Sequence, residues 1–222
     1  MSIVSRDEQA VPMPPIEPVA AMDYHATIVN ALACRRSTLD VALSQLSTQA
    51  MVLTEVAILL VEALRTGHKV LAVGNGGAAA QAQHFAAELV GRFKRERAPY
   101  AVLSLTTDTS ILTAIANDYS YQDVFERQVL ALGRSGDLLL AFSTSGESEN
   151  IIRAAKAAQR SLMAVIVLTS DRPNRLECLA NVTVRVPVVD TALTQELHMV
   201  VIHILCDLVE SELAACEGDT GK

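Results

Sequence analysis

The chain contains no tryptophan and has few aromatic residues of any kind. Phe, Trp and Tyr together make up 4% of its 222 residues, whereas hydrophobic residues make up 50%. A core with so few rings must be built from Ala, Val, Leu and Ile, which is typical of parallel sheets covered by helices. The length allows one sizeable core, so we expect one domain, or at most two.

Cysteine is also scarce. The four cysteines (Cys34, Cys178, Cys206 and Cys216) form no CxxC pair, and the first three lie in apolar stretches. Disulfides and a thiolate zinc site are therefore not expected, and a reducing compartment fits better.

Excess positive charge is absent as well, because the formal net charge is −7. This argues against a nucleic-acid surface, which needs a basic patch. The one short basic cluster, "GRFKRER" at 91–97, is interpreted as a solvated helix end. No uninterrupted apolar run reaches 18 residues and no signal peptide is recognisable, so we expect a soluble cytoplasmic protein without a membrane partner.

Proline is concentrated at the start of the chain. Four of the seven prolines lie in "VPMPPIEP", which predicts a flexible arm over residues 1–21. We expect a single domain over 22–216, with N-terminal helices at 22–66 and an α/β core at 67–216, and then a short tail, 217–222. Within 22–66, helical periodicity predicts two helices, "HATIVNALACRRSTLDVAL" and "QAMVLTEVAILLVEALRTG". Such a pair either covers the sheet or packs on another subunit.

From residue 67 onwards apolar runs alternate with helical patterns, which is typical of βαβ units. The expected strands are 69–73, 100–105, 137–142, 164–168 and 182–186. The expected helices are 78–94, about 109–131, 148–161, 172–180 and 191–214. We predict a three-layer, flavodoxin-like α/β sandwich with a five-stranded parallel sheet and helices on both faces.

The loop "GNGG" follows the first expected strand. Gly74, Gly76 and Ala79 satisfy the looser dinucleotide pattern G-x-G-x-x-A. That pattern also needs an acidic residue at the end of the second strand, where only Asp108 follows at some distance. Dinucleotide binding therefore stays a weaker alternative to a phosphate-binding role.

The loop "STSGES", Ser143–Ser148, follows the third expected strand. Hydroxyl groups and unpaired backbone N–H groups at a helix N-terminus favour a bound phosphate. The alternative is that Ser145 or Ser148 merely caps the helix.

Two helices carry residues suited to metal binding. His84 and Glu88 lie four residues apart on one helix, and Gln195 and His203 share a ridge on the last helix. Two imidazoles, a carboxylate and an amide can form a zinc site. Aldose–ketose isomerisation needs a base at carbon, an acid/base at oxygen and oxyanion stabilisation, which such a set supplies. The alternative is a satisfied core histidine in each helix. His198 has no partner on such a ridge, so we expect it to be structural.

Several separated motifs resemble the phosphoheptose isomerases of the sugar isomerase (SIS) superfamily. They are "GNGGAAAQAQHFAAELVGRF", "TTDTSILTAIANDYSYQDVF", "GDLLLAFSTSGES" and "QELHMVVIHIL", within roughly residues 50–210. The resemblance implies the predicted fold, assembled as a homotetramer with sites between subunits. It implies conversion of sedoheptulose 7-phosphate to glycero-manno-heptose 7-phosphate, the first step of heptose supply to lipopolysaccharide.

The resemblance also implies roles for individual residues. Zinc would be held by His84, Glu88, Gln195 and His203, with Glu88 as the base and His203 as its acid/base partner. The substrate would contact Asn75, Gly76, Gly77, Glu88, Arg92, Asn117, Asp118 and Gln195. Its phosphate would be held by Ser143, Thr144, Ser145 and Ser148.

Three positions depart from the family pattern. Ala78 replaces a serine, Glu147 an asparagine and Leu193 an arginine, which weakens the expected binding of phosphate. "AQHFAA", "LTAIAND" and "LCDLVE" equally resemble a non-enzymatic branch that binds the replication initiator protein. The presence of Glu88 and His203 favours the enzyme, and a sugar-phosphate sensor without turnover is the third alternative.

Overall fold

The computed structural model describes residues 23–218. The chain divides into two units, residues 1–38 and 39–222, and helix α1 (Tyr24–Leu46) begins in the first unit and ends in the second. The predicted arm, 1–21, and residues 219–222 of the predicted tail lie outside the described residues. In the first unit, large hydrophobic side chains are exposed at Tyr24, Ile28, Val29 and Leu32.

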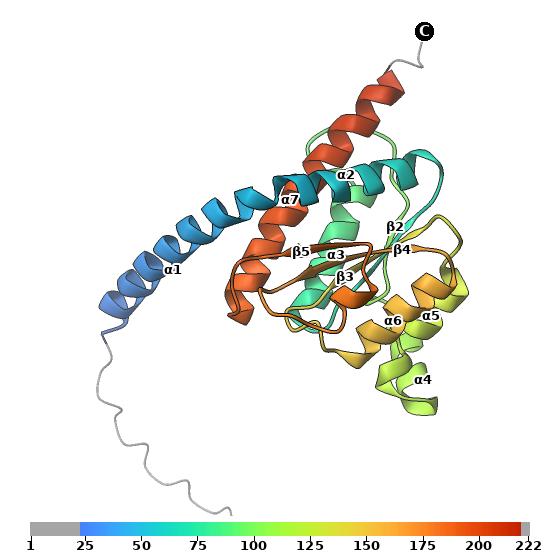
Figure 1. The fold of residues 1–222 in the computed structure, drawn as a ribbon, viewed down its shortest axis with the longest axis horizontal. Coiled ribbons are helices and arrows are strands. Elements are labelled where there is room, and N and C mark those ends of the chain that lie inside the picture. The colour runs from blue at the N-terminus through green and yellow to red at the C-terminus, as the bar shows by residue number, and fades with distance from the viewer. Residues whose placement is uncertain (1–22, 219–222) are drawn as a thin grey trace, which may run out of the picture. The chain divides into compact units, whose positions relative to one another are not determined.

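The second unit contains a five-stranded parallel sheet in the order β2-β1-β3-β4-β5 (Figure 1). The strands are β1 (Val70–Val73), β2 (Val102–Ser104), β3 (Leu138–Phe142), β4 (Ala164–Thr169) and β5 (Val182–Arg185). This is the flavodoxin-like strand order, and its switch point lies between β1 and β3. The predicted fold class is confirmed, with each expected strand found.

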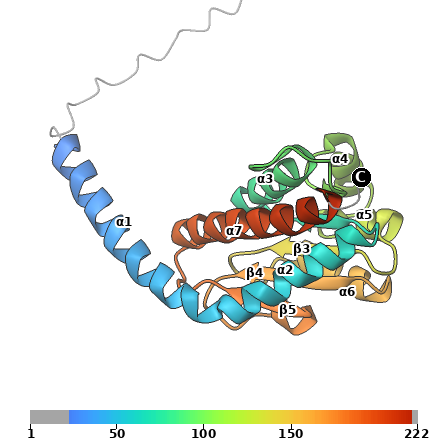
Figure 2. The ribbon, with the colours of Figure 1, turned by 90° about the horizontal axis from the view of Figure 1, so that it is seen from above.

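Alternation along the strands builds a core on each face of the sheet. Leu138, Leu140 and Phe142 of β3 belong to one core, and Leu139 and Ala141 belong to the other. The first core is closed by α2 (Ala50–Arg65), α3 (Gly77–Val90) and α7 (Thr191–Gly218). Figure 1 shows α2 above the sheet and α6 (Glu149–Arg160) below it, and in Figure 2, seen from above, α2 lies in front of the strands.

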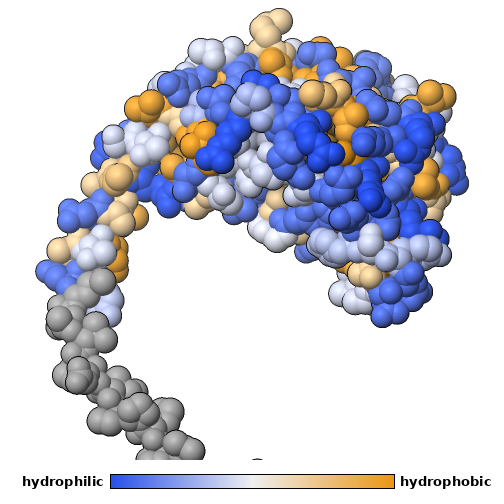
Figure 3. Space-filling view, turned by 60° about the horizontal axis from the view of Figure 1, so that its bottom comes forward, coloured by the Kyte–Doolittle hydropathy of each residue, from blue (hydrophilic) through white to orange (hydrophobic). Residues whose placement is uncertain are grey.

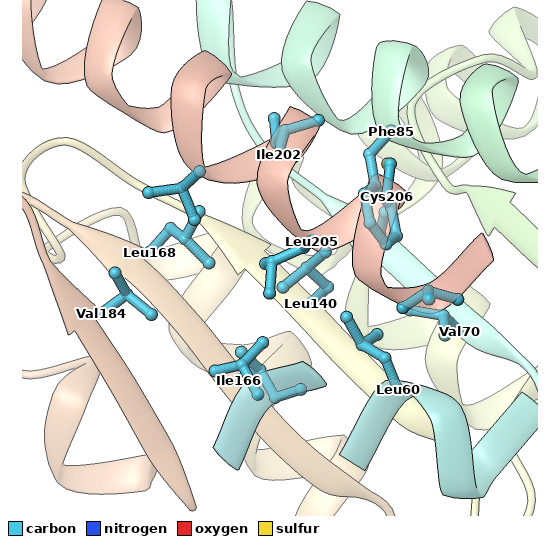
Figure 4. Packing of buried hydrophobic residues seen from close by; sticks show 14 of the residues in the cluster. Leu60, Val70, Phe85, Leu140, Ile166, Leu168, Val184, Ile202, Leu205 and Cys206 are labelled. Carbon is cyan, nitrogen blue, oxygen red and sulfur yellow. The ribbon is translucent and has the colours of Figure 1, made fainter. Parts of the chain in front are cut away.

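The close-up in Figure 4 shows how the first core joins the helices to the strands. Phe85 of α3 and Ile202 of α7 lie above Leu140 of β3 in this view, and Leu60 of α2 lies below it. Phe85, Leu60, Ile202, Leu140 and Leu168 are completely buried. Burial of this kind contributes about 1.5–3 kcal/mol for each large side chain, so the positions of α3 and α7 relative to each other are strongly specified.

The prediction of one continuous helix over 109–131 is wrong. The structure has α4 (Thr109–Asp118), a 3₁₀ turn η2 (Tyr121–Asp123) and α5 (Glu126–Leu132). Ser120 is extended, and its hydroxyl donates to Asp123 Oδ2 at 2.6 Å. Such a local side-chain bond competes with the helical hydrogen bonds and breaks the helix.

The predicted helix at 172–180 is also wrong, because only a 3₁₀ turn forms there, η3 (Glu177–Leu179). Pro173 has no N–H to donate. The Asn174 side chain bonds to Thr169 Oγ1 and to the carbonyl of Arg172, and it accepts the N–H of Glu177. These bonds hold the segment as a loop against the end of β4.

Two helical segments, Tyr24–Arg65 and Thr191–Ala215, are long and apolar enough to span a membrane by length and composition. This is weak evidence for a membrane protein, because core helices of soluble proteins meet the same criterion. Leu197, Val201 and Ile202 of α7 are buried in the first core. On the face shown in Figure 3, hydrophobic residues are interspersed among hydrophilic ones.

Candidate active site

The turn after β1 needs glycine for two different reasons. A Cβ on Gly74 would lie 2.4 Å from the carbonyl oxygen of Ala78, which no side chain tolerates. Gly76 has φ of +55°, a conformation that non-glycine residues rarely adopt. The turn therefore closes tightly at the switch point of the sheet and starts α3 at Gly77.

Gly77 leaves room for a side chain from the far end of the chain. A Cβ at this position would lie 2.4 Å from Gln195 Nε2, so the amide of Gln195 rests directly on the turn. Gln81 Nε2 donates to the backbone carbonyl of Gln195 at 2.7 Å. The start of α7 is thus fixed against the start of α3.

Asn75 is held by an amide pair that the sequence analysis missed. Asn75 Nδ2 donates to Asn150 Oδ1, and Asn150 Nδ2 donates to Asn75 Oδ1, both at 2.9 Å. The Tyr121 hydroxyl also donates to Asn75 Oδ1, at 3.0 Å. The position of Asn150, two residues after the hydroxyl-rich loop, is the sequence signal that would have found it.

A small pocket of about 70 Å³ opens between the two loops. It is lined by Asn75, Ala78, Phe142, Ser143, Thr144, Ser145, Ser148, Ile151 and Gln195. Ser148 occupies the N-cap position of α6 but makes no side-chain capping bond. A helix N-terminus, with three serines and a threonine around it, faces this pocket, an arrangement that suits an anion.

Glu147 does not line the pocket. Its Oε1 accepts the backbone N–H of Arg175 at 2.8 Å, and its Oε2 lies 4.0 Å from the Arg175 guanidinium. The acidic residue that departs from the family pattern is therefore paired with a cation on the neighbouring loop.

His84, Glu88 and His203 converge farther along α3 and α7, about 10 Å or more along the helices from Gly77 and Gln195. His84 Nε2 lies 3.0 Å from His203 Nε2 and 3.2 Å from Glu88 Oε1. The candidate ligand atoms of all three residues lie within 4.8 Å of one another. Two imidazole nitrogens and a carboxylate at such spacing suit a zinc ion, which prefers four nitrogen, oxygen or sulfur donors.

Gln195 lies on α7 toward the hydroxyl-rich loop. It precedes His203 by eight residues on α7, which corresponds to about 12 Å of helix. Its amide lies at Gly77 and lines the pocket. The structure thus brings His84, Glu88 and His203 together, and the amide of Gln195 lies between the turn at Gly77 and the hydroxyl-rich loop.

The other expected substrate contacts lie outside the pocket lining. Arg92 is exposed and pairs with Glu96, with Nε and Oε2 3.8 Å apart. Asn117 and Asp118 are exposed at the end of α4, where Asn117 Nδ2 donates to Asp118 Oδ1 at 2.8 Å.

The interpretation of residues 91–97 as a solvated helix end is right for the exposure of Arg92, Lys94 and Arg95, but wrong for the helix and for Arg97. Helix α3 ends at Val90, and the cluster forms a loop whose Arg97 side chain is only 1% exposed. The buried carboxylate of Glu210 on α7 accepts backbone N–H groups of this loop. The sequence feature that points to this contact is an acidic residue, Glu210, in the otherwise apolar helix seven residues after His203.

Two further groups near the site are buried. His198 is completely buried, and desolvation lowers its pKa to about 4, so its ring is neutral at pH 7. Burial raises the pKa of Cys206 to about 12, so its thiol is unreactive. Cys34 and Cys178 are exposed, although both lie in apolar stretches of the sequence.

The sheet order and the two loops define a sugar-isomerase-type domain, and the model of the SIS domain family matches residues 36–170. The phosphoheptose isomerase of Thiobacillus denitrificans is 48% identical over 200 residues, which cover 88% of this chain and 100% of that protein.

Solved structures give the same result. The phosphoheptose isomerase of Neisseria gonorrhoeae has a TM-score of 0.77 and 40% identity, covering 83% of this chain and 99% of that one. The one from Francisella tularensis has a TM-score of 0.79 and 34% identity, covering 86% and 100%. The chain therefore belongs to the phosphoheptose isomerase family of SIS-domain proteins.

Proposed function

We propose that the protein is an aldose–ketose isomerase that converts sedoheptulose 7-phosphate to D-glycero-D-manno-heptose 7-phosphate. The observation that carries this proposal is the convergence of His84, Glu88 and His203 on two helices that also border a phosphate-sized pocket. The relatives named above carry the corresponding name.

The separation of the two parts of the site suits a long sugar phosphate. Gln195 in the pocket and His203 in the cluster are about 12 Å apart along α7. With C–C bonds of ~1.5 Å, an extended seven-carbon chain and its phosphate ester reach roughly 10 Å. This reach is of the same order as the backbone separation of Gln195 and His203, so we propose that the phosphate lies in the pocket while the carbonyl lies at the cluster, and that binding of the phosphate orients the reacting carbons.

In the proposed reaction, Glu88 removes a proton from C1 of the ketose and returns it to C2. His203 takes the proton of the C1 hydroxyl and supplies one to the C2 oxygen, so that the enediol becomes an aldose without net gain or loss of protons. A carboxylate and an imidazole beside each other suit this pair of transfers.

We propose that His84, Glu88 and His203 hold a zinc ion, with Gln195 as the fourth donor on the substrate side. When bound, zinc polarises the carbonyl and stabilises the charge that develops on oxygen. One carboxylate oxygen of Glu88 would hold the metal, and the other would be free to act as the base.

The remaining contacts belong to the same proposal. Ser143, Thr144, Ser145 and Ser148 hold the phosphate, and the turn at Asn75, Gly76 and Gly77 lines the sugar chain. Arg92, Asn117 and Asp118 contact the substrate from outside the pocket lining.

In a homotetramer with sites between subunits, Arg92, Asn117 and Asp118 would reach the site of a neighbouring subunit. An apolar groove supports such assembly: it is lined by Thr54, Ala57, Ile58, Val61, Glu62, Arg65, Leu208 and Glu212. Ile58 and Leu208 in it are exposed. We further propose that the enzyme acts in the cytoplasm as one SIS domain over residues 22–216, at the first step of heptose supply to lipopolysaccharide.

The test is turnover of sedoheptulose 7-phosphate by the purified protein, followed by NMR with and without added zinc. We expect zinc-dependent formation of the aldose. Absence of product from folded, zinc-loaded protein would contradict the proposal. In that case, binding of the sugar phosphate without turnover would favour a sensor, and capture of the replication initiator would favour the non-enzymatic branch.

A further inference from the structure

The carboxylate of Glu210 is the most completely enclosed acidic group next to the cluster. Its side chain is 0% exposed. Oε1 accepts the backbone N–H of Phe93 at 2.9 Å, and Oε2 accepts those of Lys94 and Arg95 at 2.7 and 2.9 Å. Three consecutive N–H groups of one loop thus bind one carboxylate, which fixes the course of that loop.

Arg97 closes the same arrangement from the other side. Its Nε lies 3.3 Å from Glu210 Oε1, and Nη2 donates to the backbone carbonyl of Glu88 at 3.0 Å. Nη1 donates to the carbonyl of Gly91, also at 3.0 Å. The guanidinium therefore satisfies carbonyl groups at the end of α3 and neutralises the carboxylate on α7.

The loop held in this way places a ring on the cluster. Phe93 stacks on the His203 imidazole, with ring centroids 5.5 Å apart and an interplanar angle of 22°. His203 and Glu210 are seven residues apart on α7, so they lie on the same side of the helix. One buried ion pair thus connects the backbone of Glu88 with the face of the His203 ring.

We propose that Glu210 and Arg97 are positioning residues for the His84–Glu88–His203 cluster. Within the described residues, no hydrogen bond or ion pair joins either of them to the side chains of the cluster. Glu210 folds the 91–97 loop so that Phe93 packs on His203, and Arg97 fixes the last turn of α3, which carries Glu88, against α7. This inference rests on the proposed isomerase function for its effect on turnover, but not for its effect on the geometry of His203.

Asp207 provides a matched control. It lies on the same helix and pairs with the same loop, with Oδ2 2.8 Å from Lys94 Nζ and Oδ1 3.0 Å from Arg95 Nη1. Its side chain is 36% exposed, and it accepts no backbone N–H group of the loop in the described structure. Loss of its charge removes exposed ion pairs without changing the course of the loop.

The test compares Glu210→Gln, Phe93→Leu and Asp207→Asn in two measurements. The first is the NMR shift of His203 Cε1–H in metal-free protein, assigned with His203→Gln. We expect this shift to change in Glu210→Gln and Phe93→Leu, because each disturbs the aromatic ring that stacks on the imidazole, and to stay unchanged in Asp207→Asn.

The second measurement is kcat and KM with sedoheptulose 7-phosphate. Loss of a residue that orients ligands costs about 10–100-fold in activity. We expect a fall of this size in kcat for Glu210→Gln, with KM within about 3-fold, and Asp207→Asn within about 2-fold of the parent protein. If Glu210→Gln does not fold, Phe93→Leu decides alone, with a smaller fall in kcat expected.

An unchanged His203 shift in the folded variants would overturn the proposal. A changed shift with unchanged kcat would also overturn it, because the contact would then serve stability only. If the parent protein has no turnover, the proposed function fails, whereas the NMR comparison still decides whether Glu210 and Phe93 place His203.

Discussion

The pocket at the strand ends and the cluster farther along α3 and α7 are built in different ways. The pocket consists of a glycine turn, hydroxyl groups and a helix N-terminus within a few residues of β1 and β3, together with Gln195 of α7. The cluster consists of three titratable side chains from α3 and α7, which meet only because these helices pack together. The pocket is thus suited to holding an anion without reacting, and the cluster to moving protons.

If this division is right, substitutions at the two ends have different signatures. Changes at the cluster lower kcat, because they remove interactions of the transition state. Changes at the pocket raise KM, because they remove interactions that are the same in the ground state and the transition state.

The largest effect is expected for Glu88→Gln. Removal of the base lowers kcat by about 10²–10⁴-fold while the fold is retained, since the side chain is partly exposed. Steady-state kinetics and a thermal melt check this, with the exposed Glu96→Gln on the following loop as the control. Full activity of Glu88→Gln would show that another group is the base.

Removal of zinc with a chelator is expected to abolish turnover, with recovery when zinc is added back. Binding of the sugar phosphate, measured by calorimetry, should weaken by only a few-fold, because its phosphate is held in the pocket. If chelation abolished substrate binding as completely as turnover, the pocket and the cluster would not have separate roles.

Glu210→Gln is expected to lower the free energy of unfolding at pH 7 by about 3–5 kcal/mol, because Arg97 is left buried without its partner. Chemical denaturation measures this. Burial raises the pKa of Glu210, but the N–H donors of Lys94, Phe93 and Arg95 and the charge of Arg97 hold it below its usual value.

The sign of the pH dependence follows from that lowered pKa. Glu210 contributes stability that is complete above the pKa of an unfolded glutamate, about 4.3, and is lost as the pH falls through its folded value. The parent protein should therefore lose more stability than Glu210→Gln when the pH is lowered from 5 to 3. Equal losses would show that the carboxylate is not held as described.

A smaller effect is expected for Ser148→Ala. Loss of one hydrogen bond to a charged phosphate costs about 1.5–3 kcal/mol, which corresponds to a rise in KM of about 10-fold or more, with kcat nearly unchanged. Ser161→Ala, at the opposite end of α6, is the matched control. An equal fall in kcat would place Ser148 in the chemistry instead.

The smallest effect is expected for Glu147→Gln, with KM within about 2-fold of the parent value. Its carboxylate is already paired with Arg175, and exposed pairs of this kind contribute little. A KM lower by tenfold would show that Glu147 repels the phosphate after all.

The sequence predicted the parts that depend on local pattern. The strands, the turn at Gly74 and Gly76 and the position of the hydroxyl-rich loop follow from apolar runs and the residues between them. The spacing of His84 and Glu88 placed them on one side of α3. Their contact with His203 was expected from the family resemblance, because periodicity alone does not show how α3 and α7 are aligned with each other.

Other features depended on contacts that local pattern does not encode. The break after Asp118 depends on the bond between Ser120 and Asp123. The loop at 91–97 is fixed by Glu210, more than a hundred residues later in the chain. Basic side chains in sequence therefore indicated a solvated helix end, whereas tertiary contacts bury Arg97.

The most direct test of the division between the two ends is calorimetric titration of Glu88→Gln with sedoheptulose 7-phosphate, followed by assay of the same sample for the aldose. The account predicts binding within a few-fold of the affinity of the parent protein and no detectable product. Loss of binding together with turnover, or product formation by the variant, would contradict it.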